Sequence, residues 1–178
     1  PNTSDIVAAS MKALQAAGYS RDNTIFVLCS DHGYPDPSRG ITPEELKSQN
    51  MTHDVFMTDD NITIPLIISY PGCTPGQKID TTISTLDLMP TLIDLLEIDV
   101  PQSVRSRWEG ISLLPLLRGE KGSEFQGRKI RTDARLMGQS GRVSALRDDT
   151  FKYVYHHDDQ REEFFDVSKF RLDEPNVI

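Results

Sequence analysis

The sequence predicts an α/β protein with a small antiparallel sheet at its C-terminal end. Three observations lead to this prediction: two stretches with helical apolar spacing, unbroken apolar runs of strand length, and a change near Lys129 to short strands separated by turns. We expect residues 1–128 to form the α/β layer and residues 129–178 to form the small β subdomain.

The first helix and strand form half of an α/β repeat. Apolar residues between Asp5 and Gly18 follow helical spacing, and Gly18 is a suitable helix stop: Val7, Met11, Leu14 and Ala17. The run Ile25–Cys29 is continuously apolar, which is typical of a strand covered on both faces in a parallel sheet. We therefore expect Cys29 to be a buried small hydrophobe, with a nucleophilic role as the alternative.

The middle of the chain contains a second strand and a second helix. Pro65 limits the strand to Leu66–Ser69, and Pro71-Gly72 ends it. An apolar stripe then predicts an amphipathic helix that begins near Asp87, with Ser84 or Thr85 as its cap: Leu86, Met89, Ile93 and Leu96. The polar stretch 34–61 between the two strands is long enough to be a functional loop.

Four short strand candidates follow near the C-terminal end. They are separated by Gly138 and Gly141, and by Asp148-Asp149, with no helical pattern between them. The candidates are Arg131–Leu136, Arg142–Arg147, Phe151–Tyr155 and Glu163–Val167. This arrangement predicts a small antiparallel sheet.

Composition excludes several classes of protein. The net charge is −8 and the 19 basic residues are scattered, which argues against nucleic acid as a partner. No apolar stretch approaches the roughly 20 residues that a membrane-spanning helix needs. The first residues, Pro1 to Asp5, resemble neither a signal peptide nor an initiator segment, so we expect a piece of a longer protein whose compartment the sequence does not reveal. Two cysteines do not make a disulfide framework.

Asp31 and His32 are the strongest candidates for a functional site. They directly follow a predicted buried strand, and ligands bind at the carboxyl ends of strands in open parallel sheets. Asp suits a hard cation and His suits a transition metal, so the pair can bind a metal ion. The alternative is an aspartate that caps a turn beside an ordinary loop histidine.

Five segments resemble motifs of the sulfatase family, in the family's order and over nearly the whole chain. They are Thr24-Ile-Phe-Val-Leu-Cys-Ser-Asp-His-Gly33, Ile64-Pro-Leu-Ile-Ile-Ser-Tyr-Pro-Gly72, Asp87-Leu-Met-Pro-Thr91, Gly110-Ile-Ser-Leu-Leu-Pro-Leu-Leu117, and Lys152-Tyr153 with the tail Glu163–Asn176. The resemblance implies the C-terminal part of an alkaline-phosphatase-like α/β sandwich.

The resemblance also implies a reaction and a cofactor. Sulfatases hydrolyse sulfate esters, which include sulfated sugars, with a formylglycine nucleophile and a divalent cation, usually Ca²⁺. Asp31 and His32 match the later pair of metal ligands in that family. The formylglycine motif Cys/Ser-x-Pro/Ala-x-Arg and the earlier Asp-Asp pair have no counterpart here. We expect both upstream of Pro1, in an N-terminal half that would be a partner of this chain, so that the chain alone is inactive.

Two features leave alternatives open. His53 stands twelve residues before Pro65, where the family has a Lys that contacts the sulfate or leaving group. His53 can act as a leaving-group acid or be a solvated loop residue. This departure keeps a phosphodiesterase, phosphonate hydrolase or phosphoglycerol transferase with Mn²⁺ or Zn²⁺ as an alternative. A non-catalytic pseudo-enzyme is the alternative from another class.

We interpret two further clusters of His and Asp residues as structural features rather than as metal sites. His156, His157, Asp158 and Asp159 are expected to close a hairpin rather than bind a second metal. Asp54, Asp59 and Asp60 are expected to lie on a solvated loop surface.

Overall fold

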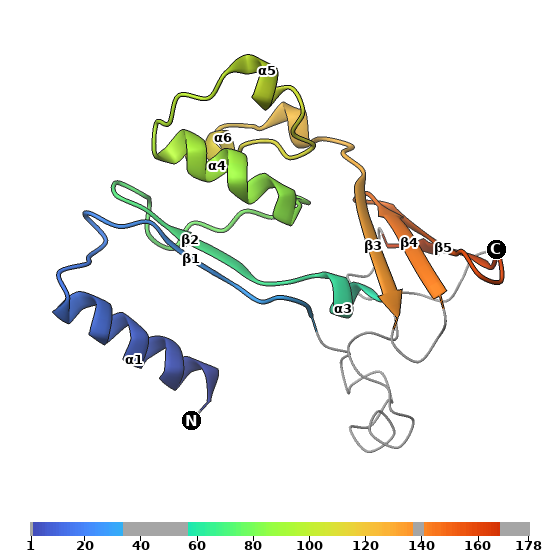
Figure 1. Cartoon of the computed structure of the whole chain (residues 1–178), viewed down its shortest axis with the longest axis horizontal. Helices are drawn as coiled ribbons and strands as arrows, with labels where there is room; N and C mark the ends of the chain where they lie inside the picture. Colours follow the sequence, from blue (N-terminus) through green and yellow to red (C-terminus); the bar gives the residue numbers. More distant parts are fainter. Residues whose placement is uncertain (1, 34–56, 137–140, 168–178) are drawn as a thin grey trace. The chain divides into compact units, whose positions relative to one another are not determined.

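The computed structural model describes residues 2–33, 57–136 and 141–167 (Figure 1). These residues form two compact units, one from residues 2–30 and 65–77 and one from residues 31–33, 57–64, 78–136 and 141–167. None of the helices in the described ranges is both long and apolar enough to cross a lipid bilayer.

The first unit contains helix α1 (Thr3–Ala16) and strands β1 (Phe26–Cys29) and β2 (Leu66–Ser69). The helix begins at a capping box in which Asn2 accepts a hydrogen bond from the Asp5 amide while the Asp5 carboxylate accepts one from the Asn2 amide. Gly18 has a φ of 91°, which confirms it as the stop after the helix. Val7 and Met11 of the predicted apolar face are half-buried.

The pairing of the first two strands corrects the expectation of a parallel sheet. β1 and β2 run antiparallel, with Phe26 opposite Ser69 and Cys29 opposite Leu66. Three of the four β1 residues are exposed, and Cys29 is one of them, so the predicted burial of this cysteine is wrong. The physical reason is that an unbroken apolar run does not determine strand direction, which depends on the partner that pairs with it.

The helical part of the second unit is built around α4 (Leu88–Leu95), which follows the short 3₁₀ helix η2 (Thr85–Asp87). Ser84 caps η2, as predicted, and Pro90 stands in the first turn of α4, where a proline is tolerated. The short helices α5 (Gln102–Arg105), α6 (Leu114–Leu117) and η3 (Ser123–Phe125) follow.

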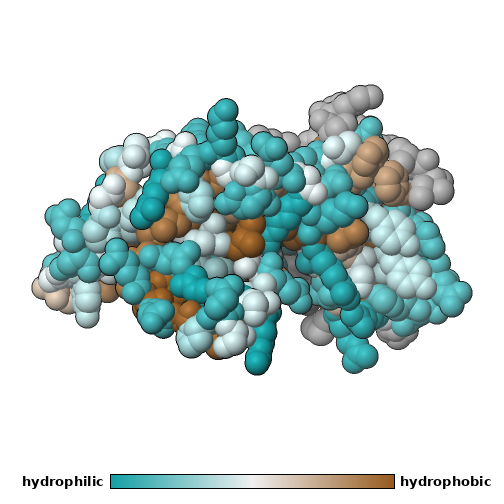
Figure 2. Space-filling view, turned by 90° about the horizontal axis from the view of Figure 1, so that it is seen from above, coloured by the Kyte–Doolittle hydropathy of each residue, from teal (hydrophilic) through white to brown (hydrophobic). Residues whose placement is uncertain are grey.

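The buried face of α4 is not the apolar stripe that the sequence predicted. Asp87 and Thr91 are fully buried, whereas Leu86, Met89 and Leu96 have exposed fractions of 53%, 61% and 57%. The polar face is buried because it bonds to residues distant in sequence. Figure 2 shows apolar surface exposed among polar side chains on one face of the molecule.

The C-terminal residues form the predicted four-stranded antiparallel sheet, in the order β3–β4–β5–β6. Its strands are β3 (Ile130–Leu136), β4 (Gly141–Arg147), β5 (Phe151–His156) and β6 (Glu162–Asp166). One face buries Val143, Ala145 and Val154 against Met57, with Ile62 and Phe165 packed beside them. This cluster fixes the segment around α3 (Asp59–Ile62) to the sheet. The division of the chain at residue 128 stays a prediction.

Candidate functional site

Asp31 and His32 follow β1 in the chain and lie at the start of the second unit. The Asp31 side chain is 86% exposed and the His32 side chain is 38% exposed. His32 Nδ1 lies 2.6 Å from the carbonyl oxygen of Gly33, and His32 Nε2 lies 3.7 Å from Asp31 Oδ2. A carbonyl oxygen only accepts hydrogen bonds, so Nδ1 carries the proton and donates. The ring lone pair is therefore on Nε2, on the side of the Asp31 carboxylate.

Gly33 holds this pair close to α3. The Gly33 amide donates to the carbonyl oxygen of Asn61 at 2.8 Å. A Cβ atom added to Gly33 would lie 1.9 Å from the backbone oxygen of Asp60, a separation that no side chain tolerates. The glycine is thus required by a close approach of two backbone segments, and the approach brings α3 beside the candidate ligands.

The chemistry of the two side chains fits a divalent cation. Asp31 offers carboxylate oxygens, which suit Ca²⁺ or Mg²⁺, and His32 offers the lone pair of Nε2, which suits Mn²⁺ or Zn²⁺. The Nδ1 hydrogen bond to a backbone carbonyl is the arrangement usual for metal-binding histidines. In the part of the chain that the structure describes, no group of three or more His, Cys, Asp or Glu residues is placed to hold a metal ion. Asp31 and His32 would therefore supply two ligands of a larger set.

Asp59 does not lie on a solvated surface, so that expectation was wrong for this residue. It is only 2% exposed, and its carboxylate binds two cationic side chains of the sheet. Arg147 Nε lies 3.1 Å from Asp59 Oδ2, and Lys152 Nζ lies 3.3 Å from Asp59 Oδ1. The sequence did not predict this contact because Arg147 and Asp59 are 88 residues apart. Lys152 belongs to the Lys152-Tyr153 motif, but that motif does not indicate which residue Lys152 binds.

His53 and Asp54 lie outside the residues that the structure describes, so the proposed role of His53 stays a prediction. The hairpin interpretation of the histidine pair agrees with the structure, since residues 157–159 form the turn between β5 and β6. Burial lowers the pKa of His156, and the charge of Arg161 lowers this pKa further. The His156 ring lies 3.0 Å from Glu163 Oε1 within the hairpin.

A polar group on the sheet involves the other histidine of this hairpin. His157 Nε2 lies 2.8 Å from Ser144 Oγ, and Ser144 donates to Asp133 at 2.6 Å. The Ser144 hydroxyl, followed by the guanidinium of Arg131, lowers the pKa of Asp133 to about 2. These residues form hydrogen bonds with one another on an exposed face of the sheet, so we interpret the group as surface structure rather than as a functional site.

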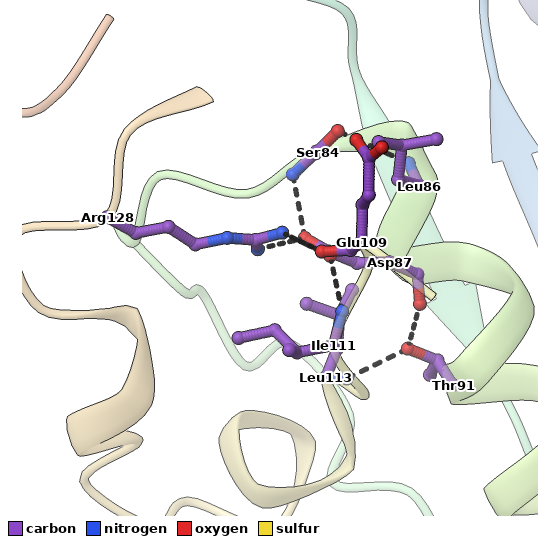
Figure 3. A network of polar contacts seen from close by, with 8 residues as sticks. All are labelled: Ser84, Leu86, Asp87, Thr91, Glu109, Ile111, Leu113 and Arg128. Atoms are coloured by element: carbon purple, nitrogen blue, oxygen red, sulfur yellow. Dashed lines mark hydrogen bonds and ion pairs between the residues drawn. The ribbon is translucent and has the colours of Figure 1, made fainter. Parts of the chain in front are cut away.

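A buried polar network in the second unit surrounds Asp87 (Figure 3). Its carboxylate accepts from the amides of Ser84 and Ile111 at 2.8 and 2.9 Å. Both terminal nitrogens of Arg128 also donate to it, at 2.7 and 2.8 Å. Thr91 continues the network, since its hydroxyl accepts from the Leu113 amide at 2.8 Å. From the sequence, Asp87 was expected to stand at the start of a helix and to open the motif Asp87-Leu-Met-Pro-Thr91. The structure makes it the residue that holds α4 to the loop before α6.

Comparisons with known proteins agree with the motifs. The family described as N-sulphoglucosamine sulphohydrolase, C-terminal, matches residues 50–177. The chain is 31% identical to the Delta 4,5-hexuronate-2-O-sulfatase of Bacteroides thetaiotaomicron over 92% of its length and 32% of that protein. It is 30% identical to the choline-sulfatase of Rhizobium meliloti over 88% of its length and 27% of that protein.

Solved structures show the same fold. A 2-O GAG sulfatase superposes with a TM-score of 0.69 at 29% identity, over 92% of this chain and 33% of that chain. The phosphonate monoester hydrolase of Silicibacter pomeroyi also superposes with a TM-score of 0.69, at 26% identity, over 96% of this chain and 33% of that chain. The chain thus spans about a third of the length of the proteins that it matches.

Proposed function

Because the chain belongs to the sulfatase family, whose C-terminal part it matches, we propose that it is the C-terminal portion of a metal-dependent enzyme that hydrolyses sulfate esters. The observation that carries this proposal is the pair Asp31 and His32, with the Nε2 lone pair and the carboxylate on the same side. These two residues would hold the metal ion together with ligands from elsewhere in the complete enzyme.

A bound divalent cation would supply charge stabilisation at the sulfate oxygens in the transition state. The chain's own contribution is orientation. The Gly33 carbonyl accepts a hydrogen bond from His32 Nδ1 and so sets the ring tautomer, and the hydrogen bond from the Gly33 amide to Asn61 anchors this turn on α3. The nucleophile, which the family makes as formylglycine, would come from a segment outside this sequence, and His53 remains the candidate leaving-group acid.

Sulfated sugars are the substrate class that we propose. The likeness to a hexuronate-2-O-sulfatase supports a sugar substrate, whereas the likeness to a choline-sulfatase supports a small alcohol as the sulfated group. The exposed apolar surfaces of α4, β1 and β2 support a further partner, the remaining part of a complete sulfatase, because apolar patches of this kind mark interaction sites.

A second candidate is hydrolysis of a phosphonate or phosphate ester. Two observations favour it: the likeness to a phosphonate monoester hydrolase, and a histidine nitrogen in the donor pair, which suits Mn²⁺ or Zn²⁺ better than Ca²⁺.

Nuclear magnetic resonance with Mn²⁺ as a paramagnetic probe tests the metal site. Addition of MnCl₂ should broaden the signals of residues 31–33 in the wild-type protein, and Asp31→Ala should abolish this local broadening. Asp99→Ala, which removes another exposed aspartate, is the matched control and should leave it unchanged. Equal broadening in the wild-type protein and Asp31→Ala would refute the metal-site proposal. Competition by Ca²⁺ or by Zn²⁺ would distinguish the first candidate from the second.

A further inference from the structure

The ion cluster around Asp59 contains buried charges, and burial of charged groups costs free energy of folding. Asp59 is 2% exposed and Lys152 is 1% exposed, and both are ionic residues in the interior of the second unit. Apolar residues of similar volume often stabilise a core as well as a buried ion pair does. Directed polar contacts contribute something that apolar packing does not, namely a defined position for each bonded group.

The position that this cluster defines is that of the segment leading into α3. Lys152 Nζ donates to the carbonyl oxygen of Met57 at 3.0 Å and lies 3.3 Å from Asp59 Oδ1. Its ammonium group also lies 4.8 Å from the centre of the Phe165 ring. Arg147 binds the same carboxylate from the neighbouring strand, with Nε 3.1 Å from Oδ2. Side chains of β4 and β5 therefore hold the segment 57–59, through the carboxylate of Asp59 and the carbonyl oxygen of Met57.

A continuous series of contacts leads from this stretch to the candidate metal ligands. Asp59 begins α3, and the carbonyl oxygen of Asn61 in α3 accepts from the Gly33 amide at 2.8 Å. The Gly33 carbonyl in turn accepts from His32 Nδ1 at 2.6 Å. Both peptide groups of Gly33 are thus engaged, one by α3 and one by the imidazole.

From this geometry we propose that Asp59 is a positioning residue for the Asp31–His32 pair, with Arg147 and Lys152 as its anchors in the C-terminal sheet. The proposal rests on the function proposed above, since it gives the small sheet a role in orienting ligands of that site. Asp59 is the first residue of α3. It acts through α3 and Gly33, and the distance of Gly33 from α3 decides whether the His32 ring keeps its hydrogen bond.

The test measures the tautomer of His32 without any metal. ¹⁵N chemical shifts of the ring, recorded at a pH where the imidazole is neutral, report which nitrogen carries the proton. In the wild-type protein the Nδ1–H tautomer should predominate. In Asp59→Asn the shifts should move toward a mixture of both tautomers, with at least a twofold fall in the ratio of the Nδ1–H to the Nε2–H form.

Asp87→Asn is the matched control, because Asp87 is also a buried aspartate paired with an arginine in the same unit. Its carboxylate binds Ser84, Ile111 and Arg128, which belong neither to α3 nor to the turn at Gly33, so the His32 shifts of this variant should stay those of the wild type. Unchanged His32 shifts in a folded Asp59→Asn, or equal changes in both variants, would overturn the proposal.

Arg147→Met tests the same proposal if Asp59→Asn does not fold. Arg147 is 21% exposed at its side chain and its loss leaves Lys152 paired with Asp59, so a smaller shift in the same direction is expected. Wild-type shifts in Arg147→Met would then overturn the proposal. Failure of Mn²⁺ to broaden residues 31–33 would instead refute the metal site and leave the tautomer result standing.

Discussion

Replacement of Asp87 by alanine should destabilise the second unit more than replacement of any exposed aspartate. The carboxylate is fully buried and accepts from two backbone amides and from both terminal nitrogens of Arg128. Truncation leaves the Arg128 guanidinium, whose side chain is 15% exposed, without its counter-ion. Loss of one partner of a buried ion pair costs about 3–5 kcal/mol.

The free energy of unfolding should therefore fall by about 4 kcal/mol, and part of this is the cost of leaving the Ser84 and Ile111 amides without their acceptor. For a chain of this size such a loss lowers the melting temperature by roughly 10 °C or more.

Urea unfolding followed by the fluorescence of Trp108 measures this change. Trp108 is the only tryptophan of the sequence and stands one residue before Glu109, whose carbonyl oxygen accepts from Arg128 at 3.4 Å. Asp94→Ala is the matched control, because Asp94 of α4 pairs with Arg105 of α5, but the two side chains are partly exposed, at 24% and 30%. Its loss should cost about 1 kcal/mol or less. Equal losses in the two variants would refute the claim that burial of the Asp87 network governs its contribution.

Three further predictions follow from the same structure. Asp133 has a pKa of about 2, below its ordinary value of 3.8, so it stabilises the fold above about pH 4, and this stabilisation is lost as the pH falls toward 2. Because its side chain is 39% exposed, the loss should stay below about 1 kcal/mol, and Asp133→Asn should flatten an acid titration of stability in this range; an identical acid profile would contradict the prediction. Gly33→Ala should cost about 1–3 kcal/mol and displace α3, because the added Cβ meets the Asp60 backbone. Gly141→Ala meets only the Asp158 side chain and should cost less in the same thermal melts, so a reversed order would count against a required glycine at position 33. The chain by itself should show no aryl-sulfate turnover and only millimolar Ca²⁺ affinity by calorimetry, because two ligands do not satisfy an ion that takes about 6–8 oxygens. Turnover that survives in the wild-type chain and disappears in Asp31→Ala would show that the site is complete within this sequence.

Much of the secondary structure could be predicted from the sequence because its causes are local. Gly18 stops α1 with a positive φ, Ser84 caps the turn before α4, and Asp148-Asp149 separate β4 from β5 where the sequence predicted, whereas Gly141 is the first residue of β4. Asp31 and His32 could be named as candidates, since a short motif directly after an apolar run is itself a local pattern, and their role as metal ligands stays a prediction. Capping, turn formation and strand alternation depend on residues within a few positions of one another.

What the tertiary structure decided concerns partners that are distant in the chain. The direction of β1 depends on β2, the burial of Asp59 depends on Arg147 and Lys152, and the face that α4 buries depends on Arg128. Each of these contacts joins residues about 40 or more positions apart, so apolar periodicity carried no information about them. Asp59 looked like a solvated loop acid because its neighbours in sequence are polar, and a carboxylate enters an interior only where cations from elsewhere in the chain compensate its loss of water.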